Sequence, residues 1–350
     1  MHAPEMVWKP RSVRNLYYIM ISLKKKVLFS IFLPMLLWGS SCGEKQPAVQ
    51  HQTVAAMDTM FSFTVGGEDP AVMQKCISLL QQLSRDLDYT EGKGTVGRLN
   101  TDGTVLCPDE TLPLLLKETA ALQNRFGYEV QLTCKPLTDL WGIATDTPYL
   151  PAAHEIAAAK GRIDDHAIAV EGKRITLTAD TALDLGAVAK GYAMDRMAEK
   201  LTESNAEYAV ISASSAVLLY GQKPEGAPFL LQITDPIDGG VLGSLTIRHE
   251  EPEQITMIGT SGGYERYSVL EGEQYSHVMD LQTGAPTESD LAAVTVVCQN
   301  GLMADFLSTS LYLGGTEGLE QIKDTDYQFL AVSHDGTCIQ STQLEFTKGE

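Results

Sequence analysis

Apolar residues recur along this chain with two different periods. Phe61–Val65 alternates apolar and polar side chains and ends at Gly66-Gly67, which indicates a strand. Residues 72–87 and 112–126 carry apolar side chains three or four positions apart, the spacing of a helix face packed on a core. This part of the chain therefore predicts a strand followed by two amphipathic helices.

Strands dominate after residue 174. Short apolar runs predict six of them, at Ile175–Leu177, Tyr208–Ile211, Val217–Tyr220, Phe229–Ile233, Leu242–Ile247 and Ala292–Val297. Two helices interrupt the run, near Ala187–Leu201 and Ala304–Leu311. Helices and strands that do not alternate strictly favour an α+β fold over a doubly wound parallel sheet. No internal repeat or long linker follows residue 55, so we expect one continuous domain over residues 56–347.

Residues 1–41 have the features of an export signal. Lys24–Lys26 is a basic segment, Val27–Trp38 is an apolar stretch short for a membrane span, and small residues precede Cys42. This order resembles a bacterial lipoprotein signal, with cleavage before Cys42 and a lipid on its sulfur. We therefore expect an exported protein, anchored to the periplasmic face of the inner membrane, with residues 42–55 as a flexible tether. An ordinary buried or membrane-anchoring helix is the alternative, which a proline in mid-run disfavours.

The net charge of the chain limits the kinds of ligand and macromolecule that it can bind. The formal net charge is −19, and because residues 1–41 hold a net +5, the remainder carries −24. So acidic a body repels nucleic acid, and no basic stripe interleaved with aromatic residues is present. An anionic ligand is repelled at long range too, so we expect a bound cation to help hold it. The six cysteines include no C-x-x-C pair, and the odd number beyond Cys42 argues against a disulfide framework.

The segment Asp184–Ala193 reads Asp-Leu-Gly-Ala-Val-Ala-Lys-Gly-Tyr-Ala. Its glycines allow close backbone approach, and a helix start offers free N–H groups and a positive dipole end that suit a pyrophosphate. Lys190 could reach the same anion. The plain alternative is a helix capped by Asp184, with Met194 and Met197 packed inward. Glycine-rich helix starts are common, so this motif by itself leaves both interpretations open.

Asp305 and Thr309 lie four residues apart, on one face of a predicted helix. A carboxylate and a hydroxyl are oxygen ligands of the kind that Mg²⁺ prefers, with water or substrate phosphate completing the octahedron. Ser308 points about 100° away on a regular helix and ranks below Thr309. The alternative is a solvated aspartate near a helix start, with the threonine facing the core.

His277 is the histidine best placed for chemistry. It stands in a strand-like segment, Tyr275–Asp280, that runs into a Gln-Thr-Gly turn, and a tight turn would fix the position of its ring. It can act as a general base or as a donor to a leaving phosphate, although a structural role is the usual one for a lone histidine. Ser261 is a weaker candidate, because nothing in the sequence pairs it with a base. The sequence contains no P-loop, Gly-x-Gly-x-x-Gly or Gly-x-Ser-x-Gly motif.

Taken together and in order, these segments resemble the FAD:protein FMN transferase (ApbE-type) family. The similarity extends over nearly everything after the tether, in six blocks: Met57–Met60, Pro136–Gly142, Asp184–Ala193, Thr260–Gly262, His277–Pro286 and Ala304–Thr309. One block alone would support this resemblance weakly. Six blocks in the same order as in the family, preceded by a lipoprotein signal, support it strongly. The chain departs from the family pattern at Ser214-Ser215, where Gly-Gly is usual. A β-carbon there matters if the backbone approaches a ligand or has positive φ.

The resemblance implies a single α+β body of mixed or antiparallel sheets with packed helices. Such a protein binds FAD and Mg²⁺, splits the pyrophosphate, passes FMN to a threonine of an acceptor protein and releases AMP. The resemblance makes His277 the base or proton shuttle and Asp305 the second catalytic residue. It places the cation on Asp305, Thr309 and the backbone carbonyl of Ala187. The residues that it assigns to FAD are Met57, Tyr89, Glu129, Val130, Asp184, Lys190 and Met279.

Two other functions stay open at this level. Water in place of threonine would make the same site a Mg²⁺-dependent FAD pyrophosphatase. The third hypothesis is a non-enzymatic flavin-binding lipoprotein, although simple storage gives no reason to keep Asp305, Thr309 and His277 together. The resemblance implies acceptors among the flavin-carrying subunits of membrane redox complexes. The oligomeric state, a homodimer included, stays open.

Overall fold

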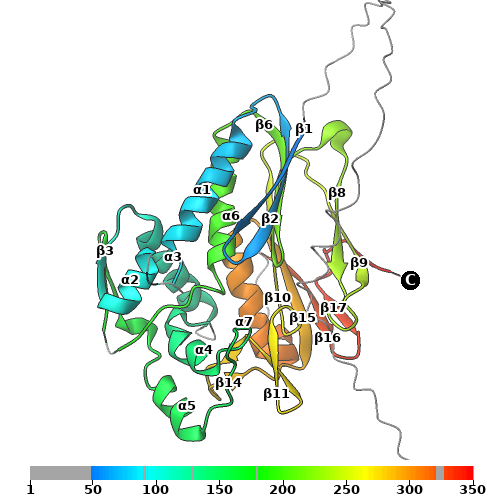
Figure 1. Ribbon diagram of the computed structural model, residues 1–350. Coiled ribbons are helices and arrows are strands. Elements are labelled where there is room, and N and C mark those ends of the chain that lie inside the picture. The colour runs from blue at the N-terminus through cyan, green and yellow to red at the C-terminus, as the bar shows by residue number, and fades with distance from the viewer. Residues whose placement is uncertain are drawn as a thin grey trace, which may run out of the picture. The chain divides into compact units, whose positions relative to one another are not determined.

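A large antiparallel sheet forms the centre of the fold. The computed structural model describes residues 49–89, 92, 94–127, 130–178, 180–320 and 327–349. The sheet has eight strands in the order β1-β2-β6-β7-β10-β15-β16-β17 (Figure 1). They are β1 (Val49–Ala56), β2 (Thr59–Gly67), β6 (Ala206–Ala213), β7 (Ala216–Gly221), β10 (Ile255–Gly262), β15 (Leu291–Cys298), β16 (Gln328–Ser333) and β17 (Cys338–Gln340). All eight residues of β15 are buried, so both faces of the sheet are covered there.

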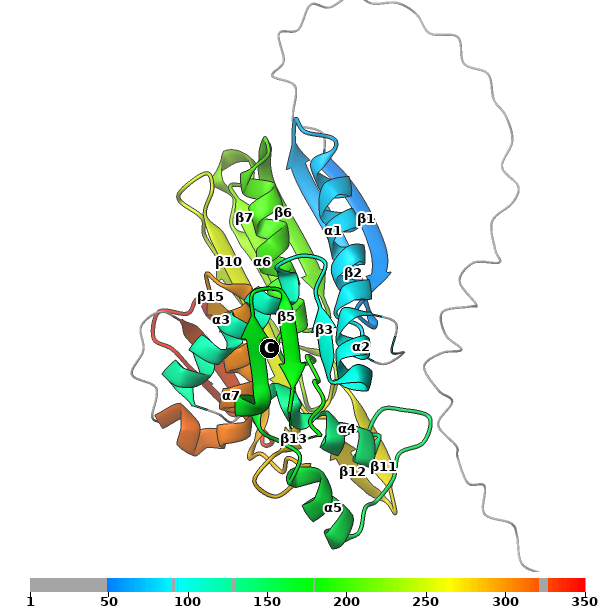
Figure 2. The ribbon, with the colours of Figure 1, turned by 90° about the vertical axis from the view of Figure 1, so that its left-hand side faces the viewer.

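Three helices cover one face of this sheet. They are α1 (Val72–Asp86), α6 (Ala189–Thr202) and α7 (Gly301–Glu320), and Figures 1 and 2 show them side by side against the strands. Each buries an apolar stripe: Ile77 and Leu80 of α1, for example, are almost completely buried. On the strand side, Phe61 and Phe63 of β2 alternate with exposed residues and point into the same core.

A smaller sheet covers the opposite face. It has the order β18-β9-β8, with β8 (Phe229–Thr234), β9 (Val241–Ile247) and β18 (Phe346–Lys348). Phe229 and Leu245 of this sheet share a separate hydrophobic cluster with Tyr208, Leu219 and Val297 of the large sheet. The layers are therefore helices, large sheet and small sheet, which confirms the predicted α+β fold with antiparallel sheets.

The remaining elements surround the ends of α6 and α7. A three-stranded sheet has the order β3-β5-β4, and two hairpins pair β11 with β12 and β13 with β14. The bounds of the helices are α2 (Thr95–Asp102), α3 (Thr111–Phe126), α4 (Lys135–Trp141) and α5 (Ala153–Lys160). The strands are β3 (Thr104–Leu106), β4 (Ile168–Glu171), β5 (Arg174–Leu177), β11 (Tyr267–Leu270), β12 (Glu273–Ser276), β13 (Met279–Asp280) and β14 (Ala285–Pro286). Short 3₁₀ turns occupy Leu132–Cys134, Asp165–Ala167 and Pro224–Gly226.

The strands and helices predicted from apolar periodicity are all found, but the predicted tether needs correction. Val49–Ala56 is the edge strand β1, paired with β2 from Val49 opposite Gly66 to Ala56 opposite Thr59. Most of β1 is exposed to solvent and the middle of the strand, residues 50–53, is polar, so composition alone resembles a linker, while backbone pairing with β2 holds the segment. The predicted signal, the lipidated Cys42 and the rest of the tether lie outside the described residues.

The cysteines of the described part agree with one further prediction. Cys76, Cys107, Cys134, Cys298 and Cys338 are all free thiols, the first two and Cys298 being buried. No disulfide framework therefore supports the described chain, as expected. Among the described helices, none combines the length and the apolar character that crossing a membrane requires.

The N-terminal ends of α6 and α7 cross in direct backbone contact. A β-carbon added at Gly191 of α6 would lie 2.0 Å from the carbonyl oxygen of Gly301 in α7, so only glycine fits. Each helix also sends one carboxylate to the start of the other. Asp195 of α6 accepts the N–H groups of Gly301 at 2.6 Å and Leu302 at 2.8 Å, and Asp305 of α7 accepts that of Gly191 at 2.6 Å. These bonds satisfy N–H groups that a helix start leaves free.

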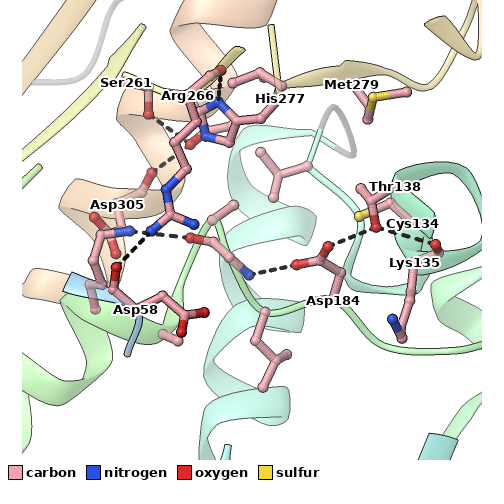
Figure 3. A pocket seen from close by; sticks show the side chains of 18 of the residues that line it. Asp58, Cys134, Lys135, Thr138, Asp184, Ser261, Arg266, His277, Met279 and Asp305 are labelled. Atoms are coloured by element: carbon pink, nitrogen blue, oxygen red, sulfur yellow. Dashed lines mark hydrogen bonds between the residues drawn. The ribbon is translucent and has the colours of Figure 1, made fainter. Parts of the chain in front are cut away.

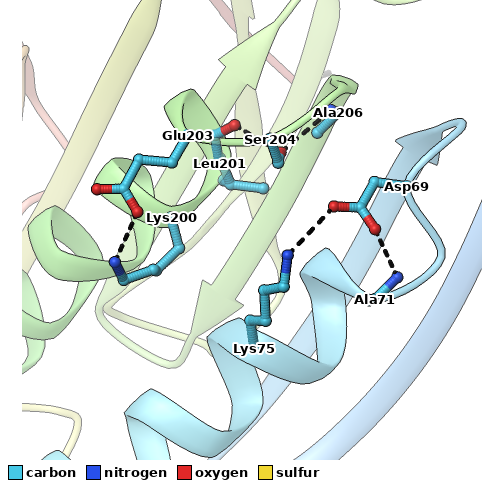
Figure 4. A network of polar contacts seen from close by, with 8 residues as sticks. All are labelled: Asp69, Ala71, Lys75, Lys200, Leu201, Glu203, Ser204 and Ala206. Carbon is cyan, nitrogen blue, oxygen red and sulfur yellow. Dashed lines mark hydrogen bonds and ion pairs between the residues drawn. The ribbon is translucent and has the colours of Figure 1, made fainter.

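Polar contacts at the outer ends of α1 and α6 differ from this buried crossing. Lys75 lies 3.5 Å from Asp69 and Lys200 lies 2.7 Å from Glu203 (Figure 4). Both pairs are partly open to solvent, and each exposed pair contributes about 0–1 kcal/mol at most. The position of α6 is therefore set by its packing on α7 and the sheet.

Candidate active site

A cavity of about 580 Å³ lies where α4, α6, α7 and the turns of the large sheet meet (Figure 3). Segments that are far apart in the sequence line it: the β1–β2 turn, the end of α1, the loop before α4, residues 184–190, the β6–β7 turn, the β10–β11 connection and residues 277–281. Of the residues predicted to act on FAD or the cation, Met57, Tyr89, Val130, Asp184, Ala187, Lys190, His277, Met279, Asp305 and Thr309 all line it. Glu129 lies outside the described residues.

Asp184 is fixed in the cavity wall by two hydrogen bonds. Its carboxylate accepts the Thr138 hydroxyl at 2.9 Å and the Gly186 N–H at 2.9 Å. The negative charge of Asp184, helped by burial, raises the pKa of the Tyr89 phenol. The Nζ of Lys135 lies 5.0 Å from the centre of the Tyr89 ring. Tyr89 is therefore a neutral aromatic wall with a fixed orientation.

The start of α6 differs from the prediction in two ways. The helix begins at Ala189, five residues after Asp184, so Asp184 does not cap it and instead belongs to the loop that enters the cavity. Gly191 approaches α7 and not a ligand. Lys190 is the second residue of the helix and its Nζ donates to the Gly186 carbonyl at 3.4 Å. The predicted inward packing of Met194 and Met197 is confirmed, because both are almost completely buried.

Asp305 is a buried carboxylate, not the solvated one of the alternative interpretation. It is 5% exposed, and burial raises its pKa, with Lys190 and the Gly191 N–H acting in the opposite direction. Among the described residues no lysine, arginine or histidine lies within ion-pair distance of it. A buried carboxylate without a cationic partner is costly, and a bound cation would remove that cost.

The residues around Asp305 fit a hard cation. The Gly191 N–H, which a continuous helix would direct to the Ala187 carbonyl, donates to Asp305 instead, and no N–H of the described residues donates to that carbonyl. Thr309 Oγ1 lies one turn along α7, where it donates to the Asp305 carbonyl at 3.2 Å and contacts Ser261 Oγ at 2.9 Å. A carboxylate, a carbonyl and a hydroxyl are the all-oxygen donor set that suits Mg²⁺.

His277 lies between β12 and β13, so the predicted strand-like segment is interrupted at this residue. The Arg266 carbonyl accepts both its backbone N–H at 3.0 Å and its ring Nδ1 at 3.1 Å. Because a carbonyl only accepts, the proton is on Nδ1, and Nε2 carries the lone pair. Burial, joined by the charges of Arg266 and Lys190, lowers the pKa of His277 to about 4. The ring is therefore a neutral base at physiological pH.

The turn after His277 is as tight as predicted. Gly284 N–H donates to the Asp280 carbonyl at 2.7 Å, and the Asp280 carboxylate accepts the Gln282 N–H at 2.7 Å. The Trp141 ring nitrogen donates to the Gly284 carbonyl at 2.9 Å, which ties the turn to α4. The geometry of the turn thus fixes the backbone on the C-terminal side of His277.

The two serines that replace a Gly-Gly pair line the cavity without backbone strain. Ser214 and Ser215 are absent from the residues with positive φ, so the left-handed conformation that favours glycine is not required there. Ser215 accepts the Thr260 N–H at 2.8 Å through its carbonyl. The departure from the family pattern therefore changes the side chains of this wall and not its backbone.

Several cavity residues were not predicted from the sequence. Glu265 and Arg266 come shortly after the Thr260–Gly262 block, which is the sequence signal that could have marked them. Burial raises the pKa of Glu265 to about 7, while Lys190 and Arg266 lower it. Other cavity residues that were not given a role from the sequence include Asp58, Ser84, Cys134, Lys135, Thr138 and Asp139. Ser261, a weak candidate nucleophile, contacts the hydroxyls of Ser308 and Thr309 and makes no hydrogen bond to His277 in the described part of the chain, which fits a supporting role.

The sequence and fold both resemble those of one known family. The sequence profile of the ApbE family matches residues 57–331. A FAD:protein FMN transferase of Salmonella typhimurium is 30% identical over 292 residues, 79% of this chain and 81% of that protein. One of Klebsiella pneumoniae is 32% identical over 202 residues, and the match spans about half of each protein. The ApbE protein of Thermotoga maritima has the same fold, with a TM-score of 0.75 at 22% identity over 84% of this chain and 97% of its own. Because the profile covers most of its length, this chain belongs to the ApbE family.

Proposed function

We propose that this protein splits FAD at its pyrophosphate and attaches FMN to a threonine of an acceptor protein, with Mg²⁺ bound at Asp305 and AMP released. The chain is a flavin transferase, as its curated relatives are. The proposal adds two details to flavin transfer: the acceptor residue is a threonine, and the reaction requires Mg²⁺. One observation carries them: a single cavity unites a neutral histidine base, a buried carboxylate with oxygen donors around it, and a lysine.

The chemistry follows from where these groups lie. Nε2 of His277 takes the proton of the threonine hydroxyl as its oxygen attacks the phosphorus of the FMN half. The bond from that phosphorus to the bridging oxygen breaks, and its electron pair leaves on the phosphate of AMP. Lys190 offers positive charge to the same phosphates. A Mg²⁺ ion held by Asp305, Thr309 and the Ala187 carbonyl would neutralise the charge that develops on the phosphate oxygens.

The rest of the cavity suits a flavin nucleotide. Met57, Val130 and Met279 supply apolar surface, and Tyr89 supplies an aromatic face. Asp184 is the fixed polar acceptor among them, since Thr138 and Gly186 hold its carboxylate in place. A ligand with one apolar ring system and a diphosphate matches this distribution.

The proposal also includes a place of action. Cys42 carries the lipid and residues 43–48 separate the anchor from β1, so that the cavity works beside the membrane on exported substrates. The acceptors are then flavin-carrying subunits of membrane redox complexes. The order of basic, apolar and small residues before Cys42 supports this part.

A direct assay separates this function from its alternatives. The purified full-length protein is mixed with FAD, MgCl₂ and a candidate acceptor, and the acceptor is examined for in-gel fluorescence and an FMN-sized mass increase on a threonine. Labelled acceptor together with AMP supports the transferase. Free FMN and AMP without labelled acceptor would identify a pyrophosphatase, and FAD bound but uncleaved would identify a storage protein.

The pH dependence of the reaction tests the role of His277. Because its pKa lies near 4 and not near 6.5, kcat/KM should stay level from pH 8 down to pH 6 and fall only below about pH 5. A histidine of ordinary pKa would already lose half of its neutral form at pH 6.5. His277→Gln should lower the rate about a hundredfold and abolish this acid limb. An unchanged limb in that variant would exclude His277 as the base.

A further inference from the structure

The side chain of Arg266 extends from the β10–β11 connection into the cavity (Figure 3). Its Nη2 donates to the Asp58 carbonyl at 3.3 Å, across 208 residues of sequence. A guanidinium carries five N–H donors in a planar fork, so this single bond to a neutral carbonyl leaves the larger part of its capacity unused. Arg266 therefore has both a fixed position and donors to offer.

The guanidinium of Arg266 has no ion-pair partner among the described residues. Lys135, another cation of the cavity, is by contrast paired with Asp139 at 2.6 Å. Lys190 is likewise without such a partner in the described chain. Lys190 and Arg266 are therefore two cations of the cavity wall that can each offer their charge to an anionic ligand, although acidic side chains, Glu265 and Asp305 among them, also line the cavity.

Arg266 is also tied to the proposed base. Its carbonyl accepts both the backbone N–H and the ring Nδ1 of His277, so its backbone lies directly against that ring. The positive charges of Arg266 and Lys190 both act on His277 and on Glu265. The two cations therefore lie near the histidine that would face the phosphorus under attack.

We infer that Arg266 is a second cationic binding residue for the pyrophosphate of FAD, in addition to Lys190. This inference rests on the proposed function for the identity of the ligand. The guanidinium fork donates to non-bridging oxygens of the diphosphate while Nη2 keeps its bond to Asp58. The site thus takes a diphosphate diester, and Arg266 holds its phosphates beside His277.

A purely structural role makes a different prediction. In that case Arg266 only joins the β1–β2 turn, where Met57 and Asp58 both have positive φ, to the β10–β11 connection. Its loss would then loosen the cavity wall at Met57 and lower the affinity for every ligand of the cavity by the same factor. If Arg266 binds phosphate, its loss lowers the affinity only for ligands that carry the diphosphate.

The test compares two partial ligands of the full-length protein. ADP carries the diphosphate without a flavin, and riboflavin carries the flavin without phosphate. Titration calorimetry measures both on wild type, Arg266→Gln, Arg266→Lys and the control Arg248→Gln, whose side chain pairs with Glu345 on the small sheet. For Arg266→Gln we expect Kd to rise tenfold or more for ADP and FAD and to stay within twofold for riboflavin. For Arg266→Lys, the Kd values for ADP and FAD should lie between those of wild type and Arg266→Gln, because lysine keeps one charged donor group. The Kd values of the control should match those of wild type.

The results separate this inference from the proposed function. Equal losses for ADP and riboflavin, or no loss for ADP, would overturn the role of Arg266. If Arg266→Gln does not fold, Arg266→Lys carries the same comparison, since its lysine can still donate to the Asp58 carbonyl. A wild-type protein that binds ADP through Arg266 but labels no acceptor would refute the proposed transfer and leave the binding role intact.

Discussion

Replacing Asp305 with asparagine is expected to lower FMN transfer about a thousandfold while the protein stays folded. The carboxylate is the only charged member of the proposed cation site, so its loss removes most of the affinity for Mg²⁺. The amide oxygen of asparagine can still accept the Gly191 N–H that Asp305 Oδ2 accepts at 2.6 Å. Alanine would remove this bond as well, and the two effects could not be told apart.

Mg²⁺ binding and transfer should be measured together on Asp305→Asn, by calorimetry and by acceptor fluorescence. Asp195→Asn is the matched control, because Asp195 makes the reciprocal helix-start bonds on α7 but does not line the cavity. It should change thermal stability and leave the activity of the folded protein near that of wild type. Transfer at the wild-type rate by Asp305→Asn would refute the assignment of Asp305 to the cation.

Replacing Gly191 with alanine is expected to lower the free energy of unfolding by about 3 kcal/mol. The added β-carbon would lie 2.0 Å from the Gly301 carbonyl oxygen and 3.0 Å from Cβ of Asp305. Both neighbours belong to the first turns of α7, and a backbone carbonyl cannot rotate away as a side chain can. The helices must therefore separate, which moves Asp305 away from the Ala187 carbonyl as well.

Urea denaturation followed by circular dichroism measures this effect. Gly314→Ala, in α7, is the matched control, since its β-carbon would meet nothing within 4 Å. That control should be neutral or stabilise by up to about 1 kcal/mol, because alanine favours the helix. A Gly191→Ala protein as stable as wild type would show that the helix crossing tolerates a wider spacing than the structure has.

Local patterns account for the parts of the site that sequence analysis predicted. Asp305 and Thr309 share a helix face because they are four residues apart, and this spacing holds in α7. The tight turn after His277 likewise follows from local turn residues, because the Asp280 carboxylate accepts the N–H two residues on and Gly284 closes the turn. Both features depend on neighbours within one turn, which a sequence displays directly.

The edge strand β1 and the loop at Asp184 are two places where local sequence patterns did not predict the structure. A polar strand at a sheet edge is held by the backbone of β2, so its own side chains give no sign of it. Asp184 looks like a helix cap, yet α6 begins later because the Gly191 N–H is taken by a residue 114 positions away. In both cases the deciding partner lies elsewhere in the chain.

The sequence by itself determined the α+β class, the positions of the helices and strands with clear apolar periodicity, and the oxygen donors that α7 presents on one face. Only the tertiary structure decided that Asp305 is buried at the start of α6, that His277 carries its proton on Nδ1, and that Arg266 reaches the cavity beside it. The burial of a carboxylate, the tautomer of a histidine and the pairing of a charge depend on which distant groups the packing brings within hydrogen-bond distance. Apolar periodicity shows only that one face of an element is buried, and it does not show which residues pack against that face.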